Sequence, residues 1–141
     1  MRLIKIYSHK NRAFQFAIAK TGKINTVEPH THDFFEITYI YEGRGTHVIN
    51  DKKYYFKGSQ ISVIPPSASH SFLSDNNENH SQVSIAVYPE LLKSYSPKSD
   101  LISLFNKIIS EKNYILTIPH AQASAVENSI ENIFHEFIFK H

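Results

Sequence analysis

The sequence predicts a mainly β protein, an antiparallel sandwich or barrel of short strands followed by helices. Three observations support this class. Between residues 13 and 88, short apolar or alternating runs are separated at close intervals by turn-forming residues. The chain contains ten Phe and eight Tyr residues, which favour strands and a well-filled core. After Pro89, apolar residues recur at the spacing of helices instead.

Composition limits what the chain does. Its 141 residues are enough for one domain with a core. The absence of cysteine excludes a disulfide scaffold and any thiolate metal site. A net charge of +2 is too small for a DNA-binding domain acting alone. No stretch is apolar enough to be a signal peptide or to span a bilayer, so we expect a cytoplasmic protein with no membrane partner.

The apolar runs and the turn-forming residues between them predict where each strand lies. Residues 3–7 and 13–19 form apolar runs, Thr21-Gly22-Lys23 has the composition of a turn, and a strand resumes near Thr26. The Asn50-Asp51 pair predicts a tight turn within a hairpin. The later strands are expected over 46–49, 53–56, 60–64, 70–73 and 82–88.

Two helices are expected after Pro89. Asp100 is placed to cap the first, which continues to residue 109, and an extended piece follows over 114–118. The second helix starts near Gln122 and has a broad apolar stripe, with Glu127 and Glu131 on the opposite face. The stripe either covers the barrel or also meets a second subunit. The dimerisation residues expected from it are Val126, Ile130, Ile133, Phe134 and Phe137.

The segment from Pro29 to Gly43 contains the residues that indicate a function. If it is one extended strand, side chains two apart share a face. His30, His32 and Glu36 then point to one side, and Thr38 and Ile40 continue the row. Imidazole and carboxylate groups on one face predict a pocket for a ligand or a metal ion.

A second histidine segment strengthens this interpretation. The two segments contain His30, His32, Glu36 and Gly43, and then Gly58, Pro65 and His70. In order and spacing they resemble the two signature motifs of the cupin superfamily. The second segment departs in two ways: it is one residue longer before Pro65, and Ser67 replaces the usual Gly. The resemblance implies a cupin-like antiparallel β-barrel, that is, a double-stranded β-helix.

In metal-binding cupins the matching positions hold the ion, so the resemblance implies His30, His32, Glu36 and His70 as ligands. Such a set suits a divalent transition metal, namely Zn, Fe, Ni or Mn. A complete hydrogen-bonded polar network without metal is the alternative, and the sequence leaves both open. Alternation adds Phe72, which shares the face of His70, to the ligand-binding residues.

The layout of nearly the whole chain resembles the N-terminal effector domain of AraC-type transcriptional regulators. The resemblance implies a sensor barrel with an N-terminal arm over 1–95 and a helical dimerisation segment over 96–141, together one structural domain. It also implies a small-molecule effector, a homodimer, and DNA binding through a C-terminal helix-turn-helix domain. That domain is absent from these residues, and the final helix has no cap, so we expect a longer natural protein.

Two other functions are compatible with the same residues. One is a stand-alone, metal-dependent cupin enzyme of the dioxygenase or isomerase type. The other is a metal-free module that binds sugars or lipids. The sequence offers no clear acid or base beyond the four candidate ligands, so we expect a sensor and not an enzyme.

Overall fold

The computed structural model describes residues 16–93, 98–116 and 118–139. The strand expected over 3–7 and the N-terminal arm lie outside these residues. The strands are β1 (Phe16–Ile24), β2 (Val27–His30), β3 (Phe35–Glu42), β4 (Arg44–Ile49), β5 (Lys52–Lys57), β6 (Gln60–Ile64), β7 (His70–Ser74), β8 (His80–Val87) and β9 (Ile115–Leu116). The helices are α1 (Pro89–Leu92), α2 (Asp100–Glu111) and α3 (Ala123–Phe139), with a 3₁₀ turn at His120–Gln122.

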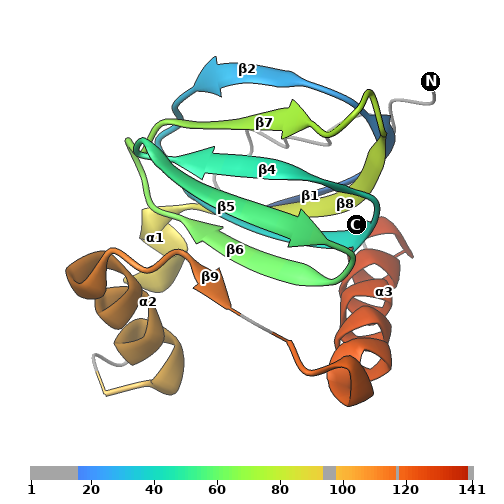
Figure 1. Ribbon diagram of the computed structural model, residues 1–141. Helices are drawn as coiled ribbons and strands as arrows, with labels where there is room; N and C mark the ends of the chain where they lie inside the picture. Colours follow the sequence, from blue (N-terminus) through green and yellow to red (C-terminus); the bar gives the residue numbers. More distant parts are fainter. Residues whose placement is uncertain (1–15, 94–97, 117, 140–141) are drawn as a thin grey trace.

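The strands form two antiparallel sheets that face each other (Figure 1). One has the order β1-β8-β3-β6-β9, and the other has the order β2-β7-β4-β5. Asn50 and Asp51 join β4 to β5 with φ values of 47° and 66°, as the tight turn requires. The predicted class, a mainly antiparallel β-barrel followed by helices, is therefore confirmed.

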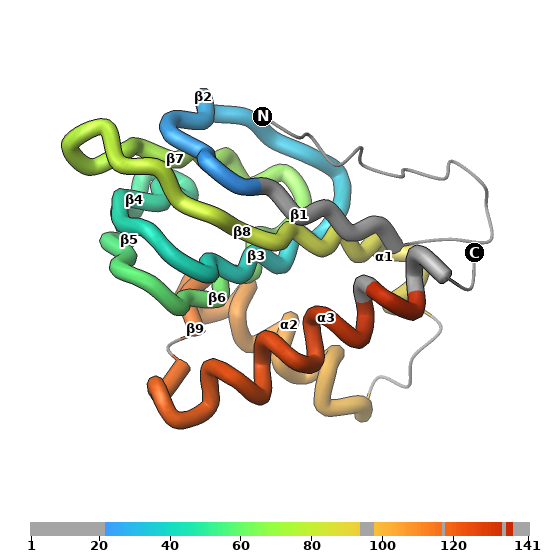
Figure 2. Tube along the Cα trace, turned by 90° about the vertical axis from the view of Figure 1, so that its right-hand side faces the viewer, coloured from blue at the N-terminus to red at the C-terminus, as the bar shows by residue number. Residues whose placement is uncertain are grey.

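The main hydrophobic core lies largely between the five-stranded sheet and the helices. Phe35 of β3 stacks on Phe105 of α2 with ring centroids 4.7 Å apart, and Ile130 of α3 joins the same core. Figure 2 shows α2 and α3 together on that side of the sheet. The helices therefore cover the outer face of the five-stranded sheet.

The space between the two sheets is lined differently. Among the described residues, a small apolar cluster there consists of the buried residues Ile40, Phe56 and Phe72. Register places several buried polar side chains on the same inward face, namely Glu36, Thr38, His47, Ser62, His70, His80 and Gln82. An interior rich in hydrogen-bonding groups is unusual for a domain core. This space is therefore the candidate location of a binding site.

Several local predictions are wrong. The segment from Pro29 to Gly43 is not one strand, because β2 ends at His30 and β3 begins at Phe35 in the other sheet. The predicted turn at 21–23 lies inside β1, where the pairing shifts register before Ile24 and Lys23 has a φ of 57°. This is a β-bulge and not a chain reversal.

The helix boundaries also differ in detail. Ser99 caps α2, since its Oγ accepts a hydrogen bond from the amide of Ile102 at 3.3 Å, so the cap is one residue earlier than predicted. The short helix α1 begins at Pro89 and was not predicted. Within the described residues, no helix is long and apolar enough to cross a bilayer.

Helix α3 packs through more than its apolar stripe. Ile130 is 7% exposed, whereas Ile133 is 39% exposed. The side chains of Phe134 and Phe137 lie outside the described residues. Glu127, expected on the opposite face, accepts a hydrogen bond of 2.8 Å from the Tyr39 hydroxyl. A polar side of α3 therefore also contacts the sheet.

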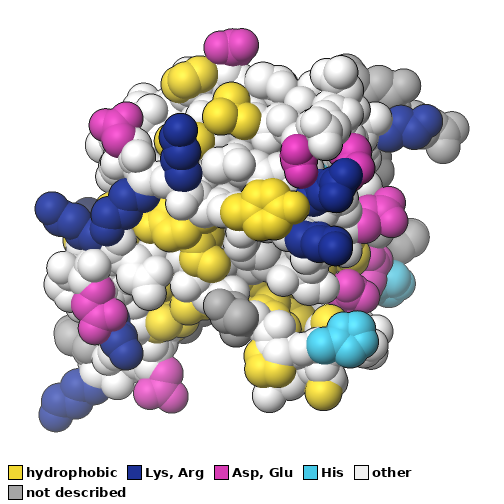
Figure 3. All heavy atoms as spheres, in the orientation of Figure 1, with side chains coloured by type: hydrophobic (Ala, Val, Ile, Leu, Met, Phe, Trp, Pro, Cys, Tyr) yellow, Lys and Arg dark blue, Asp and Glu magenta, His cyan; other side chains and the backbone are white. Residues whose placement is uncertain are grey.

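The outer face of the four-stranded sheet has no helix over it in the described part of the chain (Figure 1). Tyr55 and Leu73, 58% and 46% exposed, lie on either side of Thr46 on this face. Figure 3 shows apolar side chains lying there among lysines and arginines. Scattered exposed apolar residues of this kind are ordinary for a protein surface.

Candidate ligand and metal site

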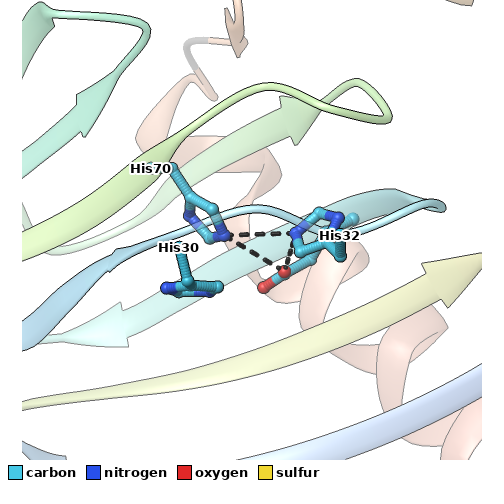
Figure 4. A group of neighbouring side chains, drawn as sticks. His30, His32 and His70 are labelled. Atoms are coloured by element: carbon cyan, nitrogen blue, oxygen red, sulfur yellow. Dashed lines mark hydrogen bonds and ion pairs between the residues drawn. The ribbon is translucent and has the colours of Figure 1, made fainter.

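Four side chains from both sheets converge at one end of the interior (Figure 4). His30 comes from β2, Glu36 from β3 and His70 from β7, and His32 lies in the connection between β2 and β3. Each offers one ligand atom, and these atoms all lie within 4.8 Å of one another. The structure thus brings together the four predicted residues, although by a change of sheet and not along one strand.

The distances among Glu36, His32 and His70 suit a metal ion. Glu36 Oε2 lies 2.8 Å from His32 Nε2 and 3.5 Å from His70 Nε2, and the two nitrogens are 3.2 Å apart. Ligand atoms about 2.1 Å from a common ion are separated by about 3.0 to 3.4 Å in tetrahedral or octahedral geometry. Three imidazoles and a carboxylate also form a donor set suited to a divalent transition metal.

Backbone carbonyls orient two of the imidazoles. His32 Nδ1 lies 2.9 Å from the carbonyl oxygen of Phe34, and His30 Nδ1 lies 2.9 Å from that of Glu28. A carbonyl only accepts, so each Nδ1 donates its proton and Nε2 remains for another partner. This is the support that metal-binding histidines commonly have. The His32 ring also stacks flat on Phe34, with centroids 4.2 Å apart.

His70 is oriented by another histidine, His47, and the sequence did not predict this contact. Its Nδ1 lies 3.0 Å from Nε2 of His47, a residue of β4 that is fully buried. The His47 ring stacks on Phe72 at a centroid distance of 4.0 Å. Burial and the neighbouring His70 lower the pKa of His47 to about 3, so it is neutral. Its Nδ1 is buried without a hydrogen-bond partner.

Charge inside the cluster is balanced between Glu36 and His32. Burial alone would raise the pKa of Glu36, but hydrogen bonds from His32 and His70 hold it well below its ordinary value. Burial alone would lower the pKa of His32, but the hydrogen bond and charge of Glu36 raise it overall. Without a metal, the carboxylate form of Glu36 and the protonated form of His32 therefore stabilise each other.

The other predicted site residues lie deeper in the interior. Thr38 Oγ1 donates to Glu36 Oε1 at 3.2 Å, so it fixes the carboxylate orientation. Ile40 and Phe72 pack against Phe56 in the apolar cluster. His30 is exposed and His70 is 2% exposed, so the cluster reaches solvent at His30 and extends inward from there.

A separate surface hollow of about 440 Å³ lies at the far ends of β3 and β5. Its lining includes Tyr41, Lys57 and Arg44, and Arg44 forms ion pairs with Asp75 and Glu78. The hollow is open, its charges are mixed, and none of the clustered histidines lines it. The histidine cluster is the better candidate for a site because its groups converge.

Comparisons with known proteins place this fold and site in context. The family model described as "AraC-like ligand binding domain" matches residues 15–131. The HTH-type transcriptional activator RhaR of Escherichia coli K12 is 31% identical over 120 residues, which cover 82% of this chain and 41% of the relative. RhaR of Enterobacter sp. strain 638 is 33% identical over 61 residues, covering 43% and 22% respectively. The chain thus spans about two fifths of the longer-matching relative.

Solved structures agree on the fold. A cupin-like protein of Thermotoga maritima has a TM-score of 0.53 at 19% identity, over 62% of this chain and 68% of that one. The plu4264 protein of Photorhabdus luminescens has a TM-score of 0.50 at 19% identity, over 60% and 72%. At such identities the likeness shows a shared cupin-like fold alone.

Proposed function

Because the chain belongs to the family of AraC-like ligand-binding domains, we propose that it is the sensor part of a transcription regulator. A small-molecule effector binds in the barrel, next to the histidine cluster. DNA binding belongs to a helix-turn-helix part outside these residues, as in relatives named HTH-type activators, and such a regulator works in the cytoplasm. The observation that carries this proposal is the family match over residues 15–131, which includes the whole cluster.

The chemistry of the interior limits the effector. One wall offers polar groups, with Glu36 and His70 near the opening and Thr38 behind them. The other side offers the apolar cluster that includes Ile40 and Phe72. A compact molecule with polar groups on one side and an apolar face on the other would satisfy both walls. Such a molecule regulates by binding one state of the protein more tightly than another.

The same cluster is proposed to hold a divalent transition metal, Zn, Fe, Ni or Mn. His30, His32, Glu36 and His70 would be the ligands, and the ion would supply a Lewis-acid contact for a polar group of the effector. Elemental analysis of the purified protein and titration with Co²⁺ test this. His32→Ala is expected to abolish binding, while His120→Ala, at an exposed position outside the cluster, leaves it unchanged. Equal binding by both variants would reject the site.

Dimerisation through α3 completes the proposed function. Val126 and Ile130 pack against the domain's own core. They therefore stabilise the fold, and any contribution to the dimer comes in addition to that. Ile133 is 39% exposed and is not among the core residues, so a second copy of the chain can reach it. A two-fold dimer is the commonest closed assembly.

The effector proposal is tested by a thermal-shift screen against sugars, organic acids and fatty acids. A compound at one hundred times its dissociation constant adds about 2.7 kcal/mol to the free energy of unfolding. A true effector must lose this effect in His70→Ala and keep it in His120→Ala. A compound that stabilises both variants equally does not bind at the cluster.

A stand-alone cupin enzyme is the second candidate, and the observation that favours it is the set of three histidines and one carboxylate. Turnover of a bound compound by the metal-loaded protein would support it. Binding without turnover, together with a larger natural protein that binds DNA, favours the sensor.

A further inference from the structure

Strand β3 occupies the centre of the five-stranded sheet, between β8 and β6. Its side chains alternate between two environments. Glu36, Thr38 and Ile40 face the interior between the sheets, whereas Phe35 and Tyr39 face the helices. The strand is therefore in contact with the candidate site on one side and with the helical segment on the other.

The inner side of β3 is tied to the histidine cluster. Glu36 accepts from His32 with one carboxylate oxygen, at 2.8 Å, and from Thr38 with the other, at 3.2 Å. A ligand or ion that moves the Glu36 carboxylate would therefore disturb the contact between Glu36 and Thr38, two successive inward residues of β3.

The outer side of β3 holds helix α3 by two hydroxyl groups. Tyr39 donates to Glu127 Oε1 at 2.8 Å, and Tyr41 donates to Glu131 Oε1 at 3.2 Å. The two glutamates are four residues apart and so lie on one side of the helix. Burial raises the pKa of Tyr39, which keeps its hydroxyl protonated and able to donate. The two rings also contact each other edge to face, with centroids 5.0 Å apart.

We propose that β3 couples the state of the histidine cluster to helix α3 through the Tyr39–Glu127 and Tyr41–Glu131 hydrogen bonds. The inference deepens the proposed sensor function and rests on the cluster being the effector site. Because protein interiors are close-packed, a shift of the backbone at Glu36 displaces the outward residues on the same strand. The two tyrosine hydroxyls then lose alignment with their carboxylates, and α3 is held less firmly.

Hydrogen–deuterium exchange measured by mass spectrometry tests this coupling without knowledge of the effector. Exchange in peptides from 123–139 is compared among the unchanged chain, Glu36→Gln, Tyr39→Phe/Tyr41→Phe, and the triple variant. In the chain that retains Tyr39 and Tyr41, we expect Glu36→Gln to raise the exchange rate of α3 at least threefold. In the Tyr39→Phe/Tyr41→Phe background, α3 already exchanges faster, and Glu36→Gln adds only the increase that its loss of global stability accounts for.

Ile108→Val is the matched control, because it removes buried packing in α2 without altering the cluster or the two tyrosines. It should change α3 exchange only in proportion to the loss of global stability. The coupling is overturned if Glu36→Gln leaves α3 exchange unchanged, or changes it equally in both backgrounds. If α3 responds as expected but no compound stabilises the protein at the cluster, the sensor proposal fails while the coupling remains.

Discussion

Glu36 Oε2 lies 2.8 Å from Nε2 of His32, and only 12% of the Glu36 side chain and 9% of the His32 side chain are exposed. The two residues are four apart in the chain, but one lies in β3 and the other in the connection that precedes it. A charged pair that is largely withdrawn from water is strongly destabilised if only one partner is removed.

This relationship predicts the pH dependence of stability in the metal-free protein. The lowered pKa of Glu36 stabilises the fold above the ordinary value of 4.5 and ceases to do so as the pH falls through the folded pKa. The raised pKa of His32 stabilises it below 6.5 and ceases to do so as the pH rises through the folded pKa. The free-energy difference between the unchanged chain and Glu36→Gln should therefore be largest, about 2 kcal/mol, between these two values.

Urea unfolding from pH 3 to 9, with a chelator present, measures this difference. It should decrease on both the acid and the alkaline side. A difference that is constant across the whole range would show that Glu36 and His32 do not form an ion pair.

Gly43 is predicted to be intolerant of a side chain. Its φ is 100°, and an added Cβ would lie 2.5 Å from the carbonyl oxygen of Asn79. Both the strained backbone and the contact oppose substitution, so Gly43→Ala should lower the free energy of unfolding by about 3 kcal/mol or more. Gly22→Ala meets only Ser81 Oγ at 3.8 Å and should change it by less than about 0.5 kcal/mol. Similar losses in both variants would contradict this reasoning.

Ser67 is predicted to be a site where a smaller residue stabilises the protein. Its φ is 67°, a left-handed conformation that is costly for any residue except Gly. Ser67→Gly should raise the free energy of unfolding by about 0.5 to 1 kcal/mol. Ser69, also exposed but without a positive φ, is the control, and Ser69→Gly should be neutral or destabilising. Thermal unfolding of the two variants decides the point.

Ile133 is predicted to contribute to association between copies of the chain. Ile133→Glu should leave the fold intact, because 39% of the residue is exposed, and should weaken dimerisation at least tenfold by burying an unpaired charge. Ile109→Glu, at a position 44% exposed on α2, should have no such effect. Sedimentation equilibrium measures both. A chain that is monomeric without substitution would refute the proposed dimer.

The strands were largely predictable because their alternation and turns are local signals. Residues 60–64 form β6 as expected, and the Asn50-Asp51 turn is where its composition placed it. The break between His30 and Phe35 was not predictable, since alternation does not reveal that a chain changes sheet. The motif spacing nevertheless identified four residues that the fold brings together.

The role of His47 was missed for a related reason. The residue has no motif partner, and only the pairing of β4 with β7 shows that it lies beside His70. The contact of Glu127 with the sheet was not predicted, because polarity favours exposure, whereas two tyrosines of β3 provide hydrogen-bond donors for the acidic side chains.

The four clustered residues come from two strands of one sheet, one strand of the other, and the connection between them. None of these segments can form the site alone, so the cluster can be assembled only after the two sheets have docked. Binding at the cluster would then follow a late step of folding, and a chain that ends before β7 would lack His70. Binding of a metal ion or an effector at the cluster is therefore expected only in a chain whose two sheets are both assembled.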